Sequence, residues 1–332
     1  MQQRELAFIS PGQGPAIASA WQSDSAAGQV IISVQRAVPE IDVGKLLTTS
    51  PSEREISALN SHILLAVMMG IASERLKPVI KGREYVATGH SAGLTNSLGM
   101  TEFFKDGSEG LGRAMVERGR LLTQAQSATP GEMFMVDWKG GNGFQEICDW
   151  VNEVGNIWLA CFNLENGEEA NVVMTQKQGS GMDKQIVKTF GDKVKVTPLP
   201  IALGAHSPLV LSVAEEYHKF LESQLQGGKI QHTSESGVEY VSDHLLPGKE
   251  QPLYSREPEE IIFDLSQVHH PVQFQKAIEF MVKVLGVKRI VELGSRNFAG
   301  IIGKMGLGIE TISVRNPREL DALVAKFANY DL

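Results

Sequence analysis

Apolar residues along the chain fall into short uninterrupted runs that alternate with longer stretches of helical spacing. The run from Leu6 to Ile9 stops at the glycine-rich residues 10–14, which predicts a buried strand followed by a loop. A similar run, residues 85–88, lies between stretches of helical spacing at residues 56–76 and 111–122. Strands that alternate with helices in this way predict a mostly parallel sheet covered on both faces.

Between residues 131 and 198 the expected elements become shorter. Strands are expected near residues 133–136, 157–162, 172–175 and 194–197, and helices near residues 144–154 and 182–190. The order strand–helix–strand–strand–helix–strand is that of a ferredoxin-like unit. We therefore expect an α/β protein with two domains. An α/β-hydrolase-like large domain, residues 1–130 and 199–332, would carry the mostly parallel sheet and an inserted ferredoxin-like small domain, residues 131–198.

The larger pattern resumes after residue 200. Helices are expected near residues 272–285 and 318–327, and strands near residues 289–293 and 311–314. Residues 226–260 hold several glycines and prolines among many polar residues, which predicts a long excursion with little regular structure. Such a segment would serve as a flap or as a surface for a partner.

Composition places the chain among ordinary soluble proteins, with 42% hydrophobic and 21% charged residues in a length of 332. The formal net charge of −8 argues against a general nucleic-acid binder, which normally has a basic face. No apolar stretch is long enough to span a bilayer and the first residues do not resemble a signal sequence, so we expect a cytoplasmic protein without membrane contact. Cys148 and Cys161 stand in apolar surroundings, which predicts two reduced core cysteines.

Candidate chemistry appears directly after the run at residues 85–88. There the sequence Gly-His-Ser-Ala-Gly, residues 89–93, precedes a helix-compatible segment, as in a nucleophile elbow. Flanking glycines relieve the crowding in such a turn, and the helix that follows presents its free N–H groups beneath the serine. The pattern predicts Ser91 as a nucleophile.

Two further motifs stand far from the elbow in sequence: Pro-Gly-Gln-Gly at residues 11–14 and Gly-Ala-His-Ser at residues 204–207. In order and spacing, and with the inserted small domain, the three motifs resemble the malonyl-CoA:acyl carrier protein transacylase family. The resemblance covers roughly residues 8–312.

The resemblance implies a role for several residues around the nucleophile. Ser91 would attack the substrate, and His206 would be the base that takes its proton. The backbone carbonyl of Gln267 would orient the histidine. The backbone N–H groups of Gln13 and Ala92 would form the oxyanion hole.

Three more residues match family positions near the substrate. Arg118 falls on the apolar stripe of its helix and matches the arginine that grips the malonyl carboxylate; a surface arginine whose stem covers apolar neighbours is the alternative. His90 would contact the acyl carboxylate or pack in the core. Asn163 matches an asparagine near the pocket.

The chain also departs from the family pattern. Leu94 replaces a glutamate, Ser61 replaces a glutamine, Pro15-Ala16 replaces a small residue and glutamine, and residues 294–296 replace Gly-Pro-Gly. Gly204 and Ala205 leave room near the acyl α-carbon, so acyl groups other than malonyl stay open.

The function expected from the resemblance is transfer of a malonyl or related acyl group from coenzyme A to the phosphopantetheine thiol of an acyl carrier protein. We expect a monomer without a bound cofactor. A metal is not expected either, because the adjacent His269 and His270 lack a clustered third ligand. Its partners would be the coenzyme A thioester and the carrier protein. The alternatives are a hydrolase of acyl-CoA or acyl carrier protein, the loading subunit of a malonate decarboxylase, and a scaffold without activity.

Overall fold

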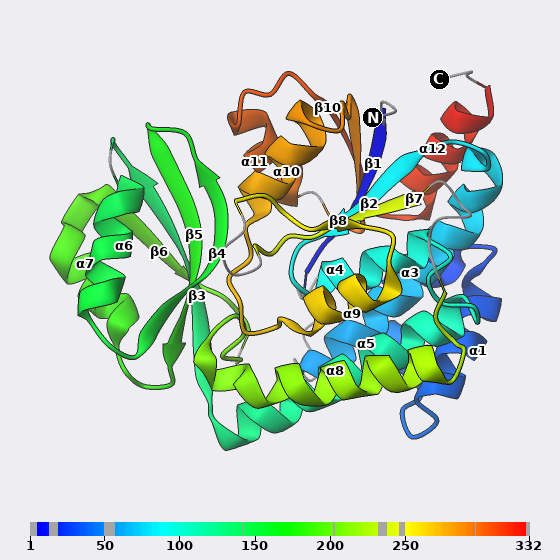
Figure 1. Ribbon diagram of the computed structural model, residues 1–332, viewed down its shortest axis with the longest axis horizontal. Helices are drawn as coiled ribbons and strands as arrows, with labels where there is room; N and C mark the ends of the chain where they lie inside the picture. Colours follow the sequence, from blue (N-terminus) through cyan, green and yellow to red (C-terminus); the bar gives the residue numbers. More distant parts are fainter. Residues whose placement is uncertain are drawn as a thin grey trace.

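The computed structural model describes residues 5–12, 19–49, 57–141, 143–201, 203–231, 238–245, 250–295 and 297–329. Its named strands form two separate sheets (Figure 1). The six-stranded sheet, in the order β10-β9-β1-β2-β7-β8, consists of β1 (Leu6–Ser10), β2 (Tyr85–Gly89), β7 (Val238–Val241), β8 (Tyr254–Ser255), β9 (Arg289–Leu293) and β10 (Glu310–Val314).

The large sheet is parallel except at one edge. β1 pairs in parallel with both β2 and β9, β7 pairs in parallel with β2, and β8 is an antiparallel edge strand. All five residues of β1 and of β2 are buried, as expected of strands covered on both faces. The carboxyl ends of β1, β2 and β7 therefore meet at one edge of the sheet. The predicted mostly parallel sheet is confirmed.

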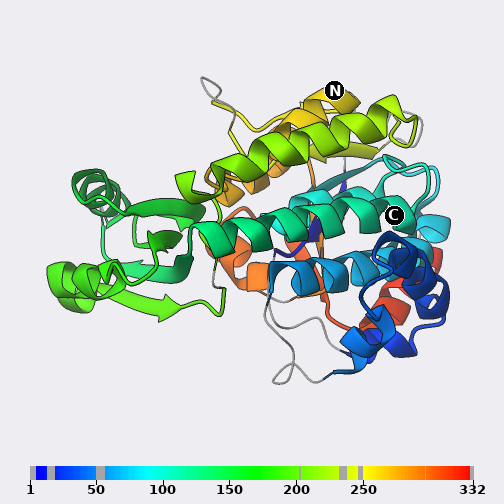
Figure 2. The same cartoon turned by 90° about the horizontal axis from the view of Figure 1, so that it is seen from below.

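Helices cover both faces of this sheet. The helices of the large unit are α1 (Ala27–Ala37), α2 (Val43–Thr48), α3 (Ala58–Ile80), α4 (Ala92–Ser97), α5 (Ser108–Ala128), α8 (Leu211–Gln226), α9 (Pro258–Ser266), α10 (Phe274–Lys283), α11 (Asn297–Lys304) and α12 (Pro317–Asn329). Of these, α1, α2 and α8 pack outside on other helices. Figure 2 shows α5 lying lengthwise between α3 and α8, and α5 contacts both. Residues 61–73 of α3 are buried without interruption, so this helix is surrounded by protein on every side.

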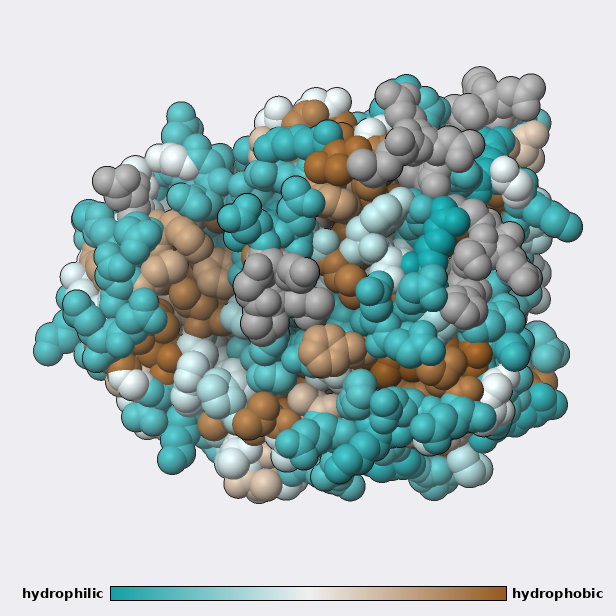
Figure 3. All heavy atoms as spheres, viewed as in Figure 1, coloured by the Kyte–Doolittle hydropathy of each residue, from teal (hydrophilic) through white to brown (hydrophobic). Residues whose placement is uncertain are grey.

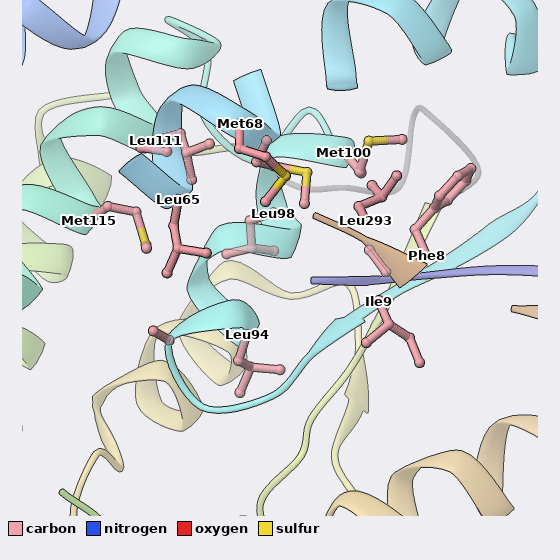
Figure 4. Packing of buried hydrophobic residues seen from close by; sticks show 14 of the residues in the cluster. Phe8, Ile9, Leu65, Met68, Leu94, Leu98, Met100, Leu111, Met115 and Leu293 are labelled. Atoms are coloured by element: carbon pink, nitrogen blue, oxygen red, sulfur yellow. The ribbon is translucent and has the colours of Figure 1, made fainter. Parts of the chain in front are cut away.

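The core joins the sheet to α3 and α4. In Figure 4, Leu94 of α4 and Leu98, just after that helix, lie close to Leu65 and Met68 of α3, and Phe8 of β1 lies nearby. All five side chains are at most 1% exposed. Burial of a leucine or phenylalanine side chain contributes roughly 1.5–3 kcal/mol. This packing fixes the start of α4, and with it the turn that precedes the helix.

The second sheet is antiparallel and has its own core. Its order is β4-β5-β3-β6, with β3 (Gly131–Lys139), β4 (Ile157–Glu165), β5 (Glu169–Lys177) and β6 (Val194–Pro198). Helices α6 (Gly143–Glu153) and α7 (Met182–Phe190) complete the expected strand and helix order. Trp138, Ile147 and Ile186 are buried between these helices and the sheet. In Figure 1 this green unit lies to the left of the large sheet.

The expectation of little regular structure over residues 226–260 was wrong for residues 238–241. The segment contains β7, which lies between β2 and β8 in the large sheet. The strand is short, and Glu239 interrupts its apolar run, yet Glu239 is only 5% exposed. The guanidinium of Arg256 donates to Glu239 and compensates its burial.

The face seen in Figure 3 is mostly hydrophilic, with apolar residues in small patches. Among the described residues, no helix combines the length and the apolar character that crossing a bilayer requires.

Candidate active site

Ser91 stands in a sharp turn between β2 and α4, as predicted. Its φ of 57° and ψ of −116° are unusual for a residue with a side chain. A Cβ on Gly89 would lie 2.0 Å from the carbonyl carbon of Gly93, and one on Gly93 would lie 2.1 Å from the carbonyl oxygen of Ser10. Only glycines fit this crossing of backbones, which explains both glycines of the motif.

His206 lies against Ser91 although the two are far apart in sequence. Ser91 Oγ and His206 Nε2 are 2.6 Å apart. On the other side of the ring, Nδ1 lies 2.8 Å from the carbonyl oxygen of His270. Because a carbonyl can only accept, Nδ1 carries the proton and Nε2 presents its lone pair to the serine hydroxyl. This is the arrangement of a nucleophile with its general base.

The carbonyl that orients His206 belongs to His270, so the expectation of Gln267 was wrong. Gln267 directly follows α9, and its own carbonyl accepts a hydrogen bond from the N–H of His270 at 2.9 Å. The turn formed in this way carries the carbonyl of His270 to the imidazole. A second bond, from the N–H of His206 to the carbonyl of Val268 at 3.1 Å, holds the two loops together.

The surroundings of His206 keep its ring neutral. Burial lowers the pKa of His206 well below its ordinary value, and the positive charges of His244 and Arg118 lower it further. His206 is 2% exposed. A neutral imidazole is the form that accepts the serine proton, so the base is ready over a wide range of pH.

A cavity of about 650 Å³ opens onto Ser91 and His206. Its described lining comes from the end of the large sheet, from the small sheet and from α11. Most of it is apolar, contributed by Met133, Met135, Val173, Leu199, Ile201, Leu203, Phe298 and Ile301. Lys304 also lines the cavity, and its ammonium is paired with Glu169 at 2.7 Å. A largely apolar ligand fits such a lining.

His90 begins a chain of side-chain hydrogen bonds that runs from the elbow into the small sheet. His90 Nε2 lies 2.9 Å from Asn163 Oδ1, Asn163 donates to Asn171 at 2.8 Å, and Asn171 donates to the carboxylate of Asp137 at 2.6 Å. The carboxylate only accepts, so every donor in the chain points away from His90. Burial lowers the pKa of His90 to about 4, and the ring is neutral with its proton on Nε2. All four residues line the cavity.

Arg118 is buried within α5, as its place on the apolar stripe suggests, with 4% of its surface exposed. One guanidinium N–H donates to Nε2 of His62 at 2.6 Å, and His62 Nδ1 lies 2.6 Å from the carbonyl of Ala58. Burial and the charge of Arg118 lower the pKa of His62 to about 3. Arg118 is not among the described residues that line the cavity, but its charge acts on His206.

The expected oxyanion hole is described in part. Ala92 is the first residue of α4, and among the described residues no hydrogen-bond acceptor is found for its N–H. The next two N–H groups, of Gly93 and Leu94, donate to the carbonyls of His90 and Ser91. Gln13, Pro15, Ala16 and Arg296 lie outside the described residues.

Sequence reasoning missed several polar residues of the site, namely Asp243, His244, His62, Asn171 and Asp137. Asp243 accepts a hydrogen bond from the backbone N–H of Ser91 at 2.6 Å. An acidic residue just after a strand could have indicated the position of Asp243, but the strand, β7, was not predicted. Within the described part of the chain, no three His, Cys, Asp or Glu side chains are grouped so as to hold a metal ion.

The fold is similar to solved structures of malonyl-CoA:acyl carrier protein transacylases. The Mycobacterium tuberculosis MCAT matches with a TM-score of 0.80 and 19% identity, over 98% of this chain and 100% of that one. The Helicobacter pylori transacylase gives the same TM-score and identity, over 98% and 99%. A malonyl-transacylase solved in complex with a type II polyketide-synthase acyl-carrier protein matches with a TM-score of 0.77 and 17% identity, over 97% and 99%.

No protein-family model and no curated protein matches the chain. At these identities the structural likeness shows the fold, a large α/β unit with a smaller antiparallel sheet, and the predicted fold class is confirmed.

Proposed function

We propose that the protein transfers an acyl group, malonyl in the first place, from coenzyme A to the phosphopantetheine thiol of an acyl carrier protein. The observation that carries the proposal is the contact of 2.6 Å between Ser91 Oγ and a neutral, carbonyl-oriented His206 at the mouth of the cavity. The similar transacylase folds support the same reaction, and one of them was solved with its carrier protein.

In the first half-reaction Ser91 Oγ attacks the thioester carbonyl while its proton moves to His206 Nε2. The imidazolium is stabilised by the hydrogen bond from Nδ1 to the carbonyl of His270. The N–H of Ala92, together with that of Gln13, would bind the oxyanion. When the C–S bond breaks, the coenzyme A sulfur takes the proton from Nε2, and the acyl group remains as an ester of Ser91.

The second half-reaction repeats these steps with another thiol. The phosphopantetheine S–H gives its proton to Nε2, its sulfur attacks the ester, and Ser91 regains a proton as it leaves. Serine, histidine and backbone N–H groups supply every step, so the reaction needs no resident cofactor.

Arg118 is proposed to select acyl groups that carry a carboxylate. Its buried positive charge acts on His206 and would attract an anionic acyl group next to Ser91. His90 and Asn163 would contact that acyl group where they line the cavity. The small residues Gly204 and Ala205 leave the choice between malonyl and related groups to experiment.

Hydrolysis is the competing reaction, because the same serine and histidine would pass the acyl group to water. The largely apolar cavity favours transfer, because an apolar lining suits the long arm of a thiol substrate better than it suits water. Cytoplasmic location, monomeric state and the domain boundaries stay predictions from the sequence.

The test is intact mass spectrometry after incubation with malonyl-CoA or with acetyl-CoA. We expect a malonyl adduct on the wild type, none on Ser91→Ala, and a weakened one on Arg118→Ala with less change for acetyl. Wild-type protein that neither gains mass nor releases coenzyme A would refute the proposal.

A further inference from the structure

Asp243 is a buried carboxylate that contacts the nucleophile but has no part in the proton transfers above. It follows β7, the neighbour of β2 in the sheet, so the carboxyl ends of the two strands bring it beside Ser91. Its Oδ2 accepts the hydrogen bond from the backbone N–H of Ser91 at 2.6 Å. None of its surface is exposed, so the carboxylate is removed from bulk water.

The backbone of Ser91 needs such an anchor. A residue with a side chain at φ 57° and ψ −116° is strained, and strain of this kind persists only where the surroundings hold it. The carbonyl of Ser91 accepts the N–H of Leu94 at 3.0 Å, and its N–H is held by Asp243. Asp243 thus holds the N–H of Ser91, whereas α4 holds its carbonyl.

A carboxylate in this place carries an electrostatic cost for acyl transfer. The oxyanion of the tetrahedral intermediate forms next to Ser91, and a negative charge beneath it opposes its formation in a buried site. An anchor with full negative charge would therefore slow the reaction that it positions, unless a positive charge compensates it.

His244 lies where that compensation is needed. Its Nε2 is 3.5 Å from Asp243 Oδ1, its Nδ1 is 3.7 Å from Asp264 Oδ1, and the residue is 3% exposed. These distances are those of ion pairs and not of hydrogen bonds; Asp264 accepts hydrogen bonds from the hydroxyls of Ser242 and Tyr240. Burial alone would lower the pKa of His244, but the two carboxylates together raise it above its ordinary value.

Besides Asp264, the described charged or titratable groups that act on the pair are Arg118, Tyr240, His206, His90, His269, His270 and Cys161. Burial raises the pKa of Asp243 to about 6, while the positive charges of His244 and Arg118 favour its ionised form. The ring of His206 lies 6.0 Å from that of His244, so the imidazolium also helps to keep the catalytic base neutral.

We infer that Asp243 and His244 form an ion pair that positions the backbone of Ser91 without leaving net negative charge beneath the oxyanion. Both are positioning residues, since they act through Ser91. The inference rests on the proposed function, because it assigns the pair to reaction at Ser91.

The test measures how fast Ser91 reacts with a fluorophosphonate, a probe of activated serines that needs no particular acyl donor. In His244→Asn the carboxylate loses the positive charge nearest to it, and we expect labelling to slow by about 100-fold, as when an oxyanion donor is lost. Asp243→Asn keeps an oxygen that accepts the Ser91 N–H, so the double variant with both substitutions is expected to recover to within about tenfold of the wild type. A double variant that is labelled more slowly than His244→Asn would overturn the inference, because two substitutions with merely structural effects would each slow the labelling.

His218→Asn is the matched control, a partly exposed histidine of α8 outside the pair, and its labelling rate is expected to stay at the wild-type level. Near-ultraviolet circular dichroism checks that each variant is folded. If His244→Asn does not fold, ¹⁵N NMR of the wild-type protein at pH 7.5 decides the question. Two protonated ring nitrogens on His244 support the ion pair, and a neutral ring overturns it.

Failure of the proposed function looks different in these experiments. A wild-type protein that fluorophosphonate labels at Ser91 but malonyl-CoA does not acylate would refute malonyl transfer and still leave the rescue by Asp243→Asn to be measured.

Discussion

The contact between His62 and Arg118 predicts how the stability of the protein changes with pH. His62 is fully buried, donates from Nδ1 to the carbonyl of Ala58, and accepts from Arg118 on Nε2. No ring nitrogen is left for another proton, which explains why the pKa of His62 falls to about 3. In the unfolded chain the same residue has a pKa of about 6.5. The unfolded state therefore binds more protons below pH 6.5, and the contribution of His62 to stability is lost as the pH falls.

The size of this effect follows from the difference in proton binding. Between about pH 6.5 and pH 5 the unfolded histidine is protonated and the folded one is not. This interval of about 1.5 pH units, at 1.36 kcal/mol per unit, lowers the free energy of unfolding by about 2 kcal/mol. His62→Gln removes this term while its amide still donates to Ala58 and accepts from Arg118. We expect the loss in free energy of unfolding between pH 7.5 and pH 5 to be about 2 kcal/mol smaller in His62→Gln than in the wild type.

Urea denaturation at the two pH values measures this difference, because other titrating groups contribute equally to both proteins. His218→Gln is the control for the chemical change; its ring lies 3.3 Å from Glu222 on the partly exposed side of α8. An equal loss of stability in His62→Gln and the wild type would refute the picture of a neutral, doubly bonded His62.

Three further predictions concern the site and its support. Because the pKa of His206 is depressed, the acidic limb of the pH profile for Ser91 acylation should fall below pH 6.5; a midpoint at or above 6.5 would contradict a neutral buried base. Asp137→Ala removes the last acceptor of the chain that starts at His90 and should lower the free energy of unfolding by about 1 kcal/mol, more than Asp137→Asn, which urea denaturation would measure; equal effects would argue against the chain. Gly93→Ala places a Cβ 2.1 Å from the carbonyl oxygen of Ser10, at the end of β1, and should lower the free energy of unfolding by about 3 kcal/mol or prevent folding. Gly303→Ala on α11 is the control: open space surrounds this position, so thermal unfolding should show no loss of stability or a gain.

Local patterns in the sequence predicted the parts of the site that depend on local geometry. The elbow at Ser91 follows from glycines that a strand-to-helix turn requires, and the burial of Arg118 follows from its place on an apolar stripe. The small sheet could be predicted because each of its strands contains a short apolar run and two recognisable helices stand at the places that a ferredoxin-like unit requires.

Partners that depend on tertiary contact could not be predicted. β7 was missed because Arg256, distant in sequence, compensates the buried Glu239. Without that strand, nothing in the sequence brought Asp243 to the nucleophile. The carbonyl that orients His206 depends on the way the chain turns after α9, which the residue types there do not specify.

The central claim is that the acyl group on Ser91 passes to a thiol and not to water. The most direct measurement loads the protein with radiolabelled malonyl-CoA, removes the excess, and adds an acyl carrier protein with or without its phosphopantetheine arm. We predict that the label leaves Ser91 rapidly and appears on the carrier protein only when the arm is present. Release of free malonate at the same rate with either form would contradict transfer and identify the protein as a hydrolase.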